Sequence, residues 1–262
     1  MRMLGLQAGA VVRLVREARD GGSPHGSILV VGPLAPQLAR LLVADGGDRT
    51  LVRTGGGDAF GASVVVCVLA GEPTAEQVAV LRSAARASVP AVAVQMGDDV
   101  VSVPYVLAGD VIACSPGQGF PIEAITNAVC RALGRRSAPL AARLPALRED
   151  AGRAIGGRAA GVAAGVAAAP WGSKARLPLL VSLQARMLRD LAVASGAPAP
   201  VTQHELGIAV GPEIGAALGV GALARTFVHR LPRSRLVDGA VAGGVTLALA
   251  TAARSPVALS RR

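Results

Sequence analysis

Aromatic residues are scarce in this sequence, which holds three Phe, one Tyr and one Trp among 262 residues. Aromatic side chains supply much of the contact area in most protein cores, and they stack on the bases of single-stranded nucleic acids. The core must therefore be built from small aliphatic side chains that approach closely. No helix-turn-helix or zinc signature is present either, so we do not expect nucleic acid as a partner.

Cysteine and histidine are equally sparse. The cysteines Cys67, Cys114 and Cys130 form no CxxC pair, which excludes a disulfide framework and argues against a structural zinc site. We expect neither a metal nor a cofactor, and we interpret Cys114 and the pair Asp98–Asp99 as turn residues rather than catalytic groups. The histidines have no carboxylate or cysteine at ligand spacing and are far apart in the sequence: His25, His204 and His229.

Charge is unevenly distributed along the chain. The net charge is +10, yet residues 1–123 hold 9 basic and 11 acidic side chains, whereas residues 124–262 hold 18 basic and 6 acidic ones. A codon bias toward arginine would act on both halves, so the asymmetry predicts an anionic partner for the second half. The arginines expected to contact anionic headgroups flank apolar segments: Arg225, Arg230, Arg233 and Arg235.

Long apolar runs are also missing. No window reaches the ~18 uncharged apolar residues of a simple membrane span, and the longest candidates for one, 159–173 and 239–253, each have 15 residues without a charge. The first residues lack the features of a signal peptide. We expect a cytoplasmic protein associated with the inner face of the cell membrane, and whether these stretches enter lipid stays open. Trp171, beside Lys174 and Arg176, suits either a membrane interface or a packing anchor.

From residue 27 onward, short β-branched runs alternate with helical patterns. This alternation predicts an α/β domain over residues 26–136, with a parallel sheet covered by helices on both faces. A separate helix is predicted at 3–19, within an N-terminal segment 1–25. Strands are predicted at 27–31, 50–53, 63–69, 91–95 and 111–113, and helices at 37–44, 74–88 and 121–133.

The second half is rich in glycine and alanine. Residues 137–170 are interpreted as a linker followed by a Gly/Ala-rich helix, and residues 171–262 as an all-α domain. Its predicted helices are 178–195, 203–210, 212–229 and 237–253. Glycines that recur every four residues form smooth stripes suited to close helix contact. They are Gly157, Gly161 and Gly165 in the first helix, and Gly211, Gly215 and Gly219 in the expected partner-binding surface.

The first strand is followed by a loop that carries a family resemblance. Gly32 stands where the GxxxxGK[ST] loop of P-loop proteins begins, but Gln37, Leu38 and Ala39 replace its second Gly, its Lys and its Ser/Thr, and two prolines remove N–H donors. With the strand spacing, residues 26–134 resemble an Era-like P-loop GTPase domain without its chemistry. The resemblance implies a GTPase-like fold that does not hydrolyse nucleotide.

Later positions match the shape of that family rather than its chemistry. Gln95-Met96-Gly97-Asp98 stands in the place of the guanine-reading NKxD, and only Asp98 matches. Segment 113–119 stands where such GTPases have a turn before their last helix. The vestigial nucleotide positions are thus Gly32, Asp98 and Gly117. A DxxG string at Asp58–Gly61 directly precedes a strand and is interpreted as accidental.

Residues 170–253 resemble the YcjF-type helical family, which follows Era-like GTPase domains in some bacterial proteins. The shared order is an amphipathic helix, a Gly-rich apolar helix, the break at Leu231-Pro232 and a second Gly-rich apolar helix. The family has no agreed biochemical activity. The resemblance therefore implies association with a membrane and no reaction.

Together these features predict a non-catalytic scaffold or regulatory protein, a pseudo-GTPase whose helical domain binds the membrane face or the apolar helices of a partner. The expected partners are an anionic membrane surface, a membrane protein, an intact GTPase or a second copy of the chain. Two alternatives remain open. One is a residual nucleotide or small-ligand binder at the strand ends, and the other is a self-associating structural protein.

Overall fold

A single parallel sheet forms the centre of the first half. The computed structural model describes residues 26–97, 102–115, 117–168, 173–196 and 235–252. Its five strands lie in the order β2-β1-β3-β4-β5, and they are β1 (Ser27–Val31), β2 (Val52–Thr54), β3 (Ala62–Leu69), β4 (Ala91–Met96) and β5 (Val111–Cys114). The parallel α/β prediction is confirmed. This order is a common doubly wound one, with its topological switch point between β1 and β3.

Strands β1, β3 and β4 are buried along nearly their whole length because helices cover both faces of the sheet. Along β1, Ile28 and Val30 join the larger core cluster, whereas Leu29 and Val31 join the smaller one. Helices α2 (Ala35–Leu42) and α4 (Ile122–Leu133) pack on the first face, and α3 (Ala75–Arg86) packs on the second. Near-continuous β-branched strands are what a doubly covered parallel sheet requires.

The second strand begins later than predicted. Residues expected to open it instead form a 3-10 turn, η1 (Arg49–Leu51), ahead of β2. The Asp48 carboxylate is the cause, because its Oδ1 accepts hydrogen bonds from the backbone N–H of Thr50 at 2.9 Å and from the Thr50 hydroxyl at 2.7 Å. Such a local side-chain cap competes with the extended backbone.

The segment interpreted as a linker is helical and buried. Residues 134–147 form η3 (Gly134–Arg136), α5 (Ser137–Arg143) and η4 (Pro145–Leu147). Leu144 and Leu147 are fully buried within the same core cluster as the sheet. The prolines did not prevent this, since a proline is tolerated in the first turn of a helix. One apolar core therefore continues from the sheet into the helices that follow.

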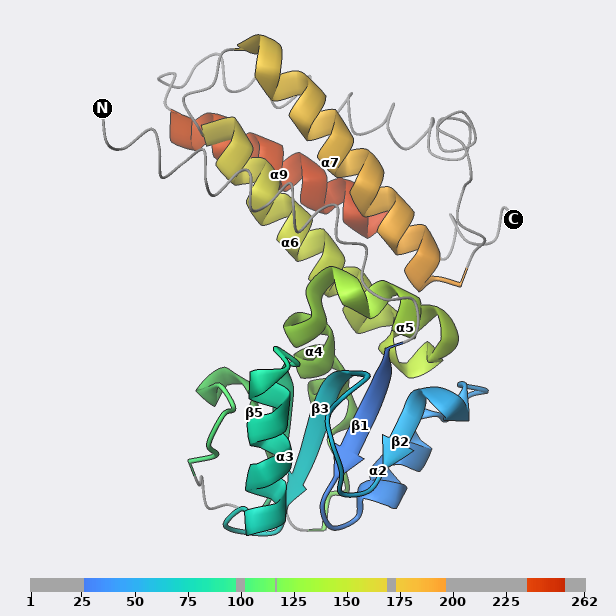
Figure 1. Cartoon of the computed structure of the whole chain (residues 1–262). Helices are drawn as coiled ribbons and strands as arrows, with labels where there is room; N and C mark the ends of the chain where they lie inside the picture. Colours follow the sequence, from blue (N-terminus) through green and yellow to red (C-terminus); the bar gives the residue numbers. More distant parts are fainter. Residues whose placement is uncertain (1–25, 98–101, 116, 169–172, 197–234, 253–262) are drawn as a thin grey trace.

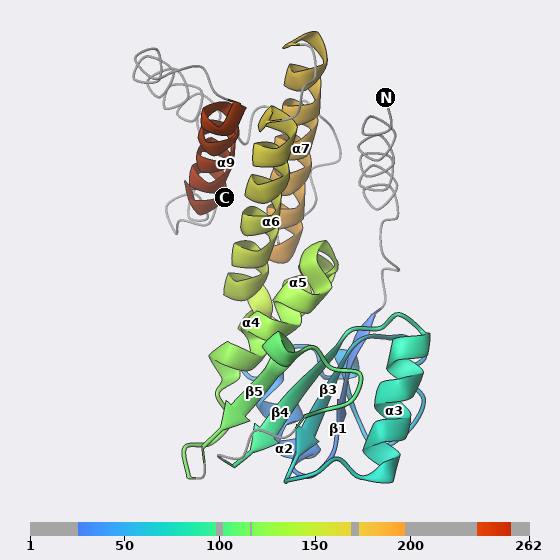
Figure 2. The same cartoon turned by 90° about the vertical axis from the view of Figure 1, so that its left-hand side faces the viewer.

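Three further helices pack side by side: α6 (Arg148–Ala168), α7 (Ser173–Ala194) and α9 (Arg235–Ala252). We call these three helices the helical arm. The carboxyl ends of the strands point away from it, at the opposite end of the molecule (Figures 1 and 2). Helices α7 and α9 correspond to the predicted helices 178–195 and 237–253. The predictions for 3–19, 203–210 and 212–229 lie outside the described residues. No helix in the described part of the chain is long and apolar enough to cross a membrane.

The glycine stripe predicted on α6 does not face its neighbours. Gly157, Gly161 and Gly165 are exposed, and a Cβ added to any of them would meet no atom of the described residues within 4 Å. The buried face lies one residue earlier, where a Cβ on Gly156 would come within 2.7 Å of the Cβ of Ala250 in α9. Within the described residues the close contact of α6 lies on a different face from this stripe, and the prediction that the stripe itself packs closely, on protein or on lipid, stays a prediction.

Candidate functional site

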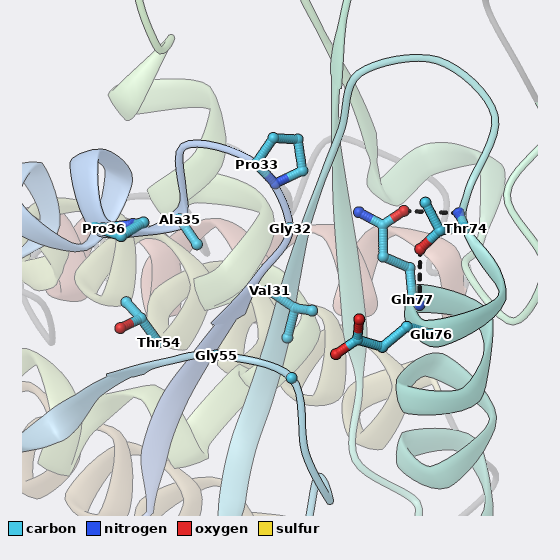
Figure 3. Close-up of a pocket in the computed structure, with 11 residues that line it drawn as sticks. Val31, Gly32, Pro33, Ala35, Pro36, Thr54, Gly55, Thr74, Glu76 and Gln77 are labelled. Atoms are coloured by element: carbon cyan, nitrogen blue, oxygen red, sulfur yellow. Dashed lines mark hydrogen bonds between the residues drawn. The ribbon is translucent and has the colours of Figure 1, made fainter.

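A cavity of about 470 Å³ opens at the carboxyl edge of the sheet. Its walls come from the end of β1 (Val31, Gly32), the end of β2 (Thr54 to Gly56) and the start of α3 (Figure 3). This is the crevice at the switch point, where open α/β sheets bind their ligands. Its volume falls in the range of ordinary ligand sites.

The loop after β1 has few N–H groups left for a ligand. Within it, the N–H of Ala35 donates to the carbonyl of Gly32 at 3.2 Å, and the N–H groups of Gln37 and Leu38 both donate to the carbonyl of Leu34. Pro33 and Pro36 have no N–H. At most one N–H of residues 33–38 therefore remains, whereas a phosphate-binding loop needs several that converge on the anion.

Gly32 is required by the close approach of β3. Its φ is +107°, and a Cβ there would lie 2.0 Å from the carbonyl oxygen of Val68 and 2.8 Å from Nε2 of Gln77. Gln77 is 5% exposed. Its Nε2 donates to the Val68 carbonyl at 2.9 Å, and its Oε1 accepts from the N–H of Thr74 at 2.9 Å. The side chain of Gln77 thus occupies the space beside the loop.

Gln77 belongs to a capping box that opens α3. The hydroxyl of Thr74 accepts from the N–H of Gln77 at 3.3 Å, while the Gln77 side chain binds the N–H of Thr74 in return. We did not single out this residue from the sequence. Its signal was present as a Thr-x-x-Gln spacing ahead of a helix.

The cavity is acidic rather than basic. Glu76 is the charged residue among its lining residues, and neither lysine nor arginine is among them in the described part of the chain. Figure 3 shows the Glu76 carboxylate beside the cavity, opposite the Thr54–Gly55 strand end, and a Cβ on Gly56 would fall 1.8 Å from its Oε1. A lone carboxylate repels phosphate and favours an ammonium or neutral polar group.

The positions that replace the P-loop residues do not reach the cavity. Leu38, at the position of the phosphate-binding Lys, is fully buried against the sheet, and Gln37 and Ala39 do not line the cavity either. Of the three vestigial positions, Gly32 lines the cavity and Gly117 does not. Asp98 lies outside the described residues.

The DxxG string lies at the opposite edge of the sheet. Asp58 accepts a hydrogen bond from the hydroxyl of Ser83 on α3 at 2.6 Å, and the carbonyl of Gly61 accepts from Ser27, which begins β1. Because β1 begins there and the cavity lies where β1 ends, this string is remote from any ligand at the cavity. The interpretation of an accidental match agrees with this placement.

The cysteines are core residues. Burial raises the pKa of Cys67 to about 11, and burial together with the Asp150 carboxylate raises that of Cys130 to about 12. The thiol of Cys114 donates to the carbonyl of Gly119 at 3.0 Å. Protonated, buried thiols are poor nucleophiles. In the described residues, no three His, Cys, Asp or Glu side chains gather where they could hold a metal ion.

Of the residues predicted to contact a partner, most lie outside the part of the chain that the structure describes. Arg235 begins α9. The other predicted contact residues lie outside the described residues: Gly211, Gly215, Gly219, Arg225, Arg230 and Arg233. Trp171 and the three histidines lie outside them as well.

The fold and the cavity define a class of protein, namely a parallel α/β protein with a crevice at its switch point. No protein-family model, no curated protein and no solved structure matches the chain.

Proposed function

We propose that this protein is a non-catalytic scaffold or regulatory protein, a degenerate Era-like pseudo-GTPase followed by a basic YcjF-like helical region that binds an anionic membrane face or a partner's helices. The observation that carries the proposal is the state of the loop after β1. It is placed like a phosphate-binding loop, at the end of the first strand of a parallel sheet, yet its donors are bonded internally or replaced by proline.

The side chains support the same proposal. A P-loop lysine reaches the β- and γ-phosphates, but the residue at that position, Leu38, packs into the core. Glu76 places negative charge at the rim of the cavity and Gln77 fills the space beside Gly32. The loop after β1 has no Lys, no Ser or Thr next to that position and no set of converging N–H groups, so phosphoryl transfer has no electrostatic support from it.

Nucleotide binding tests the catalytic half of the proposal. Calorimetric titration of the full chain with GTP or ATP and Mg²⁺ should give no binding heat, and phosphate release should equal that of buffer. The variant Gln37→Gly/Ala39→Ser is the matched control, because it leaves Leu38 in the core. It restores two positions of the motif but not the loop, so it should stay inactive. Magnesium-dependent turnover by the unmodified chain would overturn the proposal.

Vesicle co-sedimentation tests the membrane half. The full chain is needed, because Leu144 and Leu147 belong to the core of the sheet and a truncation after residue 134 would expose that core. We expect pelleting with phosphatidylglycerol-containing vesicles that weakens as salt rises, and none with pure phosphatidylcholine. Absence of pelleting with both would leave a soluble partner's helices as the binding target.

The cavity supports a second candidate function, which is the binding of a small non-phosphate ligand at the switch point. Its volume and place are those of a ligand site, and Glu76 favours an ammonium group. A thermal-shift screen of amines and neutral polar metabolites, with Glu76→Gln as the control, tests this function. Stabilisation that depends on Glu76 would support it.

A further inference from the structure

Arginines from three elements meet where the helical arm joins the rest of the molecule. Arg135 of η3 pairs with Asp190 of α7, with 2.5 Å between Nε and Oδ2. On α7, Arg186 lies one turn before Asp190 and Arg189 directly precedes it, and the charges of Arg135, Arg189 and Asp190 all shift the pKa of Arg186. We call Arg135, Arg186 and Arg189 the neck cluster. The guanidinium of Arg158 on α6 lies beside η3 as well, because a Cβ on Gly134, the residue before Arg135, would lie 2.6 Å from its NH1.

Carboxylates pair with several arginines elsewhere in the described part of the chain. Arg143 pairs with Asp48, Arg131 with Asp110, and Arg153 binds Glu149, Asp150 and Glu123. From residue 134 to residue 196 the sequence has 10 basic and 3 acidic residues. Two of those acids are already bound to Arg153, so Asp190 is the carboxylate left in this stretch for the neck cluster.

Folding therefore brings like charges together. Burial, the guanidinium of Arg135 and that of Arg189 lower the pKa of Arg186, while Asp190 raises it. Partial burial of such a group without enough counter-charge opposes folding. An external anion that joined the cluster would remove this cost and would gain charge-assisted hydrogen bonds.

The chemistry of the cluster indicates what kind of anion fits. Guanidinium groups bind phosphate through paired N–H donors, and they are more weakly hydrated than ammonium groups. The exposed face of α6 carries Gly157, Gly161 and Gly165, where an added Cβ would meet no atom of the described residues within 4 Å, and the exposed Arg158 lies beside them. No aromatic side chain lies on the described parts of α6 or α7 to stack on nucleic-acid bases.

We propose that the neck cluster binds the phosphate headgroups of anionic phospholipids and holds the helical arm against a membrane surface. The inference rests on the proposed membrane association and assigns it to a site different from Arg225, Arg230, Arg233 and Arg235. Asp190 limits the strength of this contact, because it neutralises one of the arginines.

The test compares two double variants of the full chain that each remove two positive charges. Arg186→Gln/Arg189→Gln acts on the neck cluster, and Arg49→Gln/Arg86→Gln removes two exposed arginines of the α/β half. Partition is measured on vesicles of phosphatidylcholine with and without phosphatidylglycerol, and circular dichroism and thermal melting report the fold. At ~1 kcal/mol for each basic residue near an anionic surface, the neck variant should bind about 30-fold more weakly. The control variant should bind nearly as the natural chain does.

A third variant should act in the opposite direction. Asp190→Asn removes the counter-charge of Arg135. At ~1 kcal/mol for one charge near an anionic surface, it should strengthen partition about fivefold. A purely structural role for the cluster would instead make both Asp190→Asn and the neck double variant lower the melting temperature, with equal or weaker vesicle binding.

The outcomes separate the two proposals. If the natural chain pellets with anionic vesicles and the neck variant pellets equally, the neck inference fails while membrane association stands. If the natural chain pellets with neither vesicle, both fail. Binding of a labelled RNA that is lost in the neck variant, in the absence of vesicle binding, would show that the cluster takes a nucleic acid and would overturn the lipid assignment.

Discussion

The sheet and the helical arm pack in different ways, although both have few large side chains. In the sheet, β-branched residues fill the core, as in Val64, Val66 and Val68 of β3, all of them fully buried. In the arm, α6 and α9 instead bring their backbones together, so that a Cβ on Gly243 would lie 3.2 Å from the carbonyl oxygen of Ala160. One region packs side chains, and the other packs backbones through small residues.

Glycine marks the closest approach in both regions, but for different reasons. At Gly32 both the φ of +107° and the nearby carbonyl of Val68 exclude a side chain. At Gly156 the backbone is helical and the obstacle is a neighbouring methyl group, the Cβ of Ala250. Substitution by alanine therefore separates a backbone requirement from a packing requirement.

The largest effect is expected from Gly32→Ala. The new methyl group would face a backbone oxygen at 2.0 Å in a strained φ region, so we expect a loss of at least about 3 kcal/mol in the free energy of unfolding. Urea unfolding followed by circular dichroism measures it. The control is Gly55→Ala, which has φ +128° but no atom within 4 Å of the added Cβ. Equal losses at both glycines would mean that φ alone, rather than contact with β3, requires Gly32.

Gly156→Ala should cost about 2 kcal/mol, because the added methyl must push α9 away from α6. The same urea titration measures the loss. The compensating variant Gly156→Ala/Ala250→Gly restores the space and should recover part of the stability. If Gly156→Ala were neutral and the double variant were worse, α6 and α9 would not be in contact at this point.

The two regions also differ in how much the sequence could predict. Strands β1, β3 and β4 were predictable because each is an apolar run next to turn residues, and a buried parallel strand needs little else. The face of α6 was not predictable, since glycine and alanine recur on several sides of that helix and the choice between Gly156 and Gly157 depends on where α9 lies. Of the residues that shape the cavity, some could be predicted from the sequence and others could not. Gly32 was visible from its place after β1, whereas the role of Gln77 depends on a bond to Val68 that joins different elements.

Alkaline pH should weaken the α/β half, because all three cysteines lie between residues 67 and 130. The pKa of Cys67 rises from 9.0 to about 11 on folding. The folded state thus keeps a proton that the unfolded chain loses, and the stabilisation is complete below pH 9 and is lost as pH rises through 11. We expect a loss of about 1 kcal/mol at pH 10 relative to pH 8. Cys67→Ala should reduce this pH dependence, and an unchanged dependence would assign the loss to other groups.

The smallest effect has the opposite sign and uses the residue next to Gly156. Gly157 lies in the same helix, but a Cβ there would meet no atom of the described residues within 4 Å, so Gly157→Ala should stabilise the chain by up to ~1 kcal/mol through helix propensity alone. Because the two glycines are adjacent, backbone geometry and sequence context are matched, and the difference in sign between their alanine variants measures packing. Loss of stability in Gly157→Ala would show that this face is in contact with another surface in solution. The size of this loss would then be measured with and without anionic vesicles. A loss that appears only with vesicles would mean that the surface is lipid, and a loss without them would mean that it is protein.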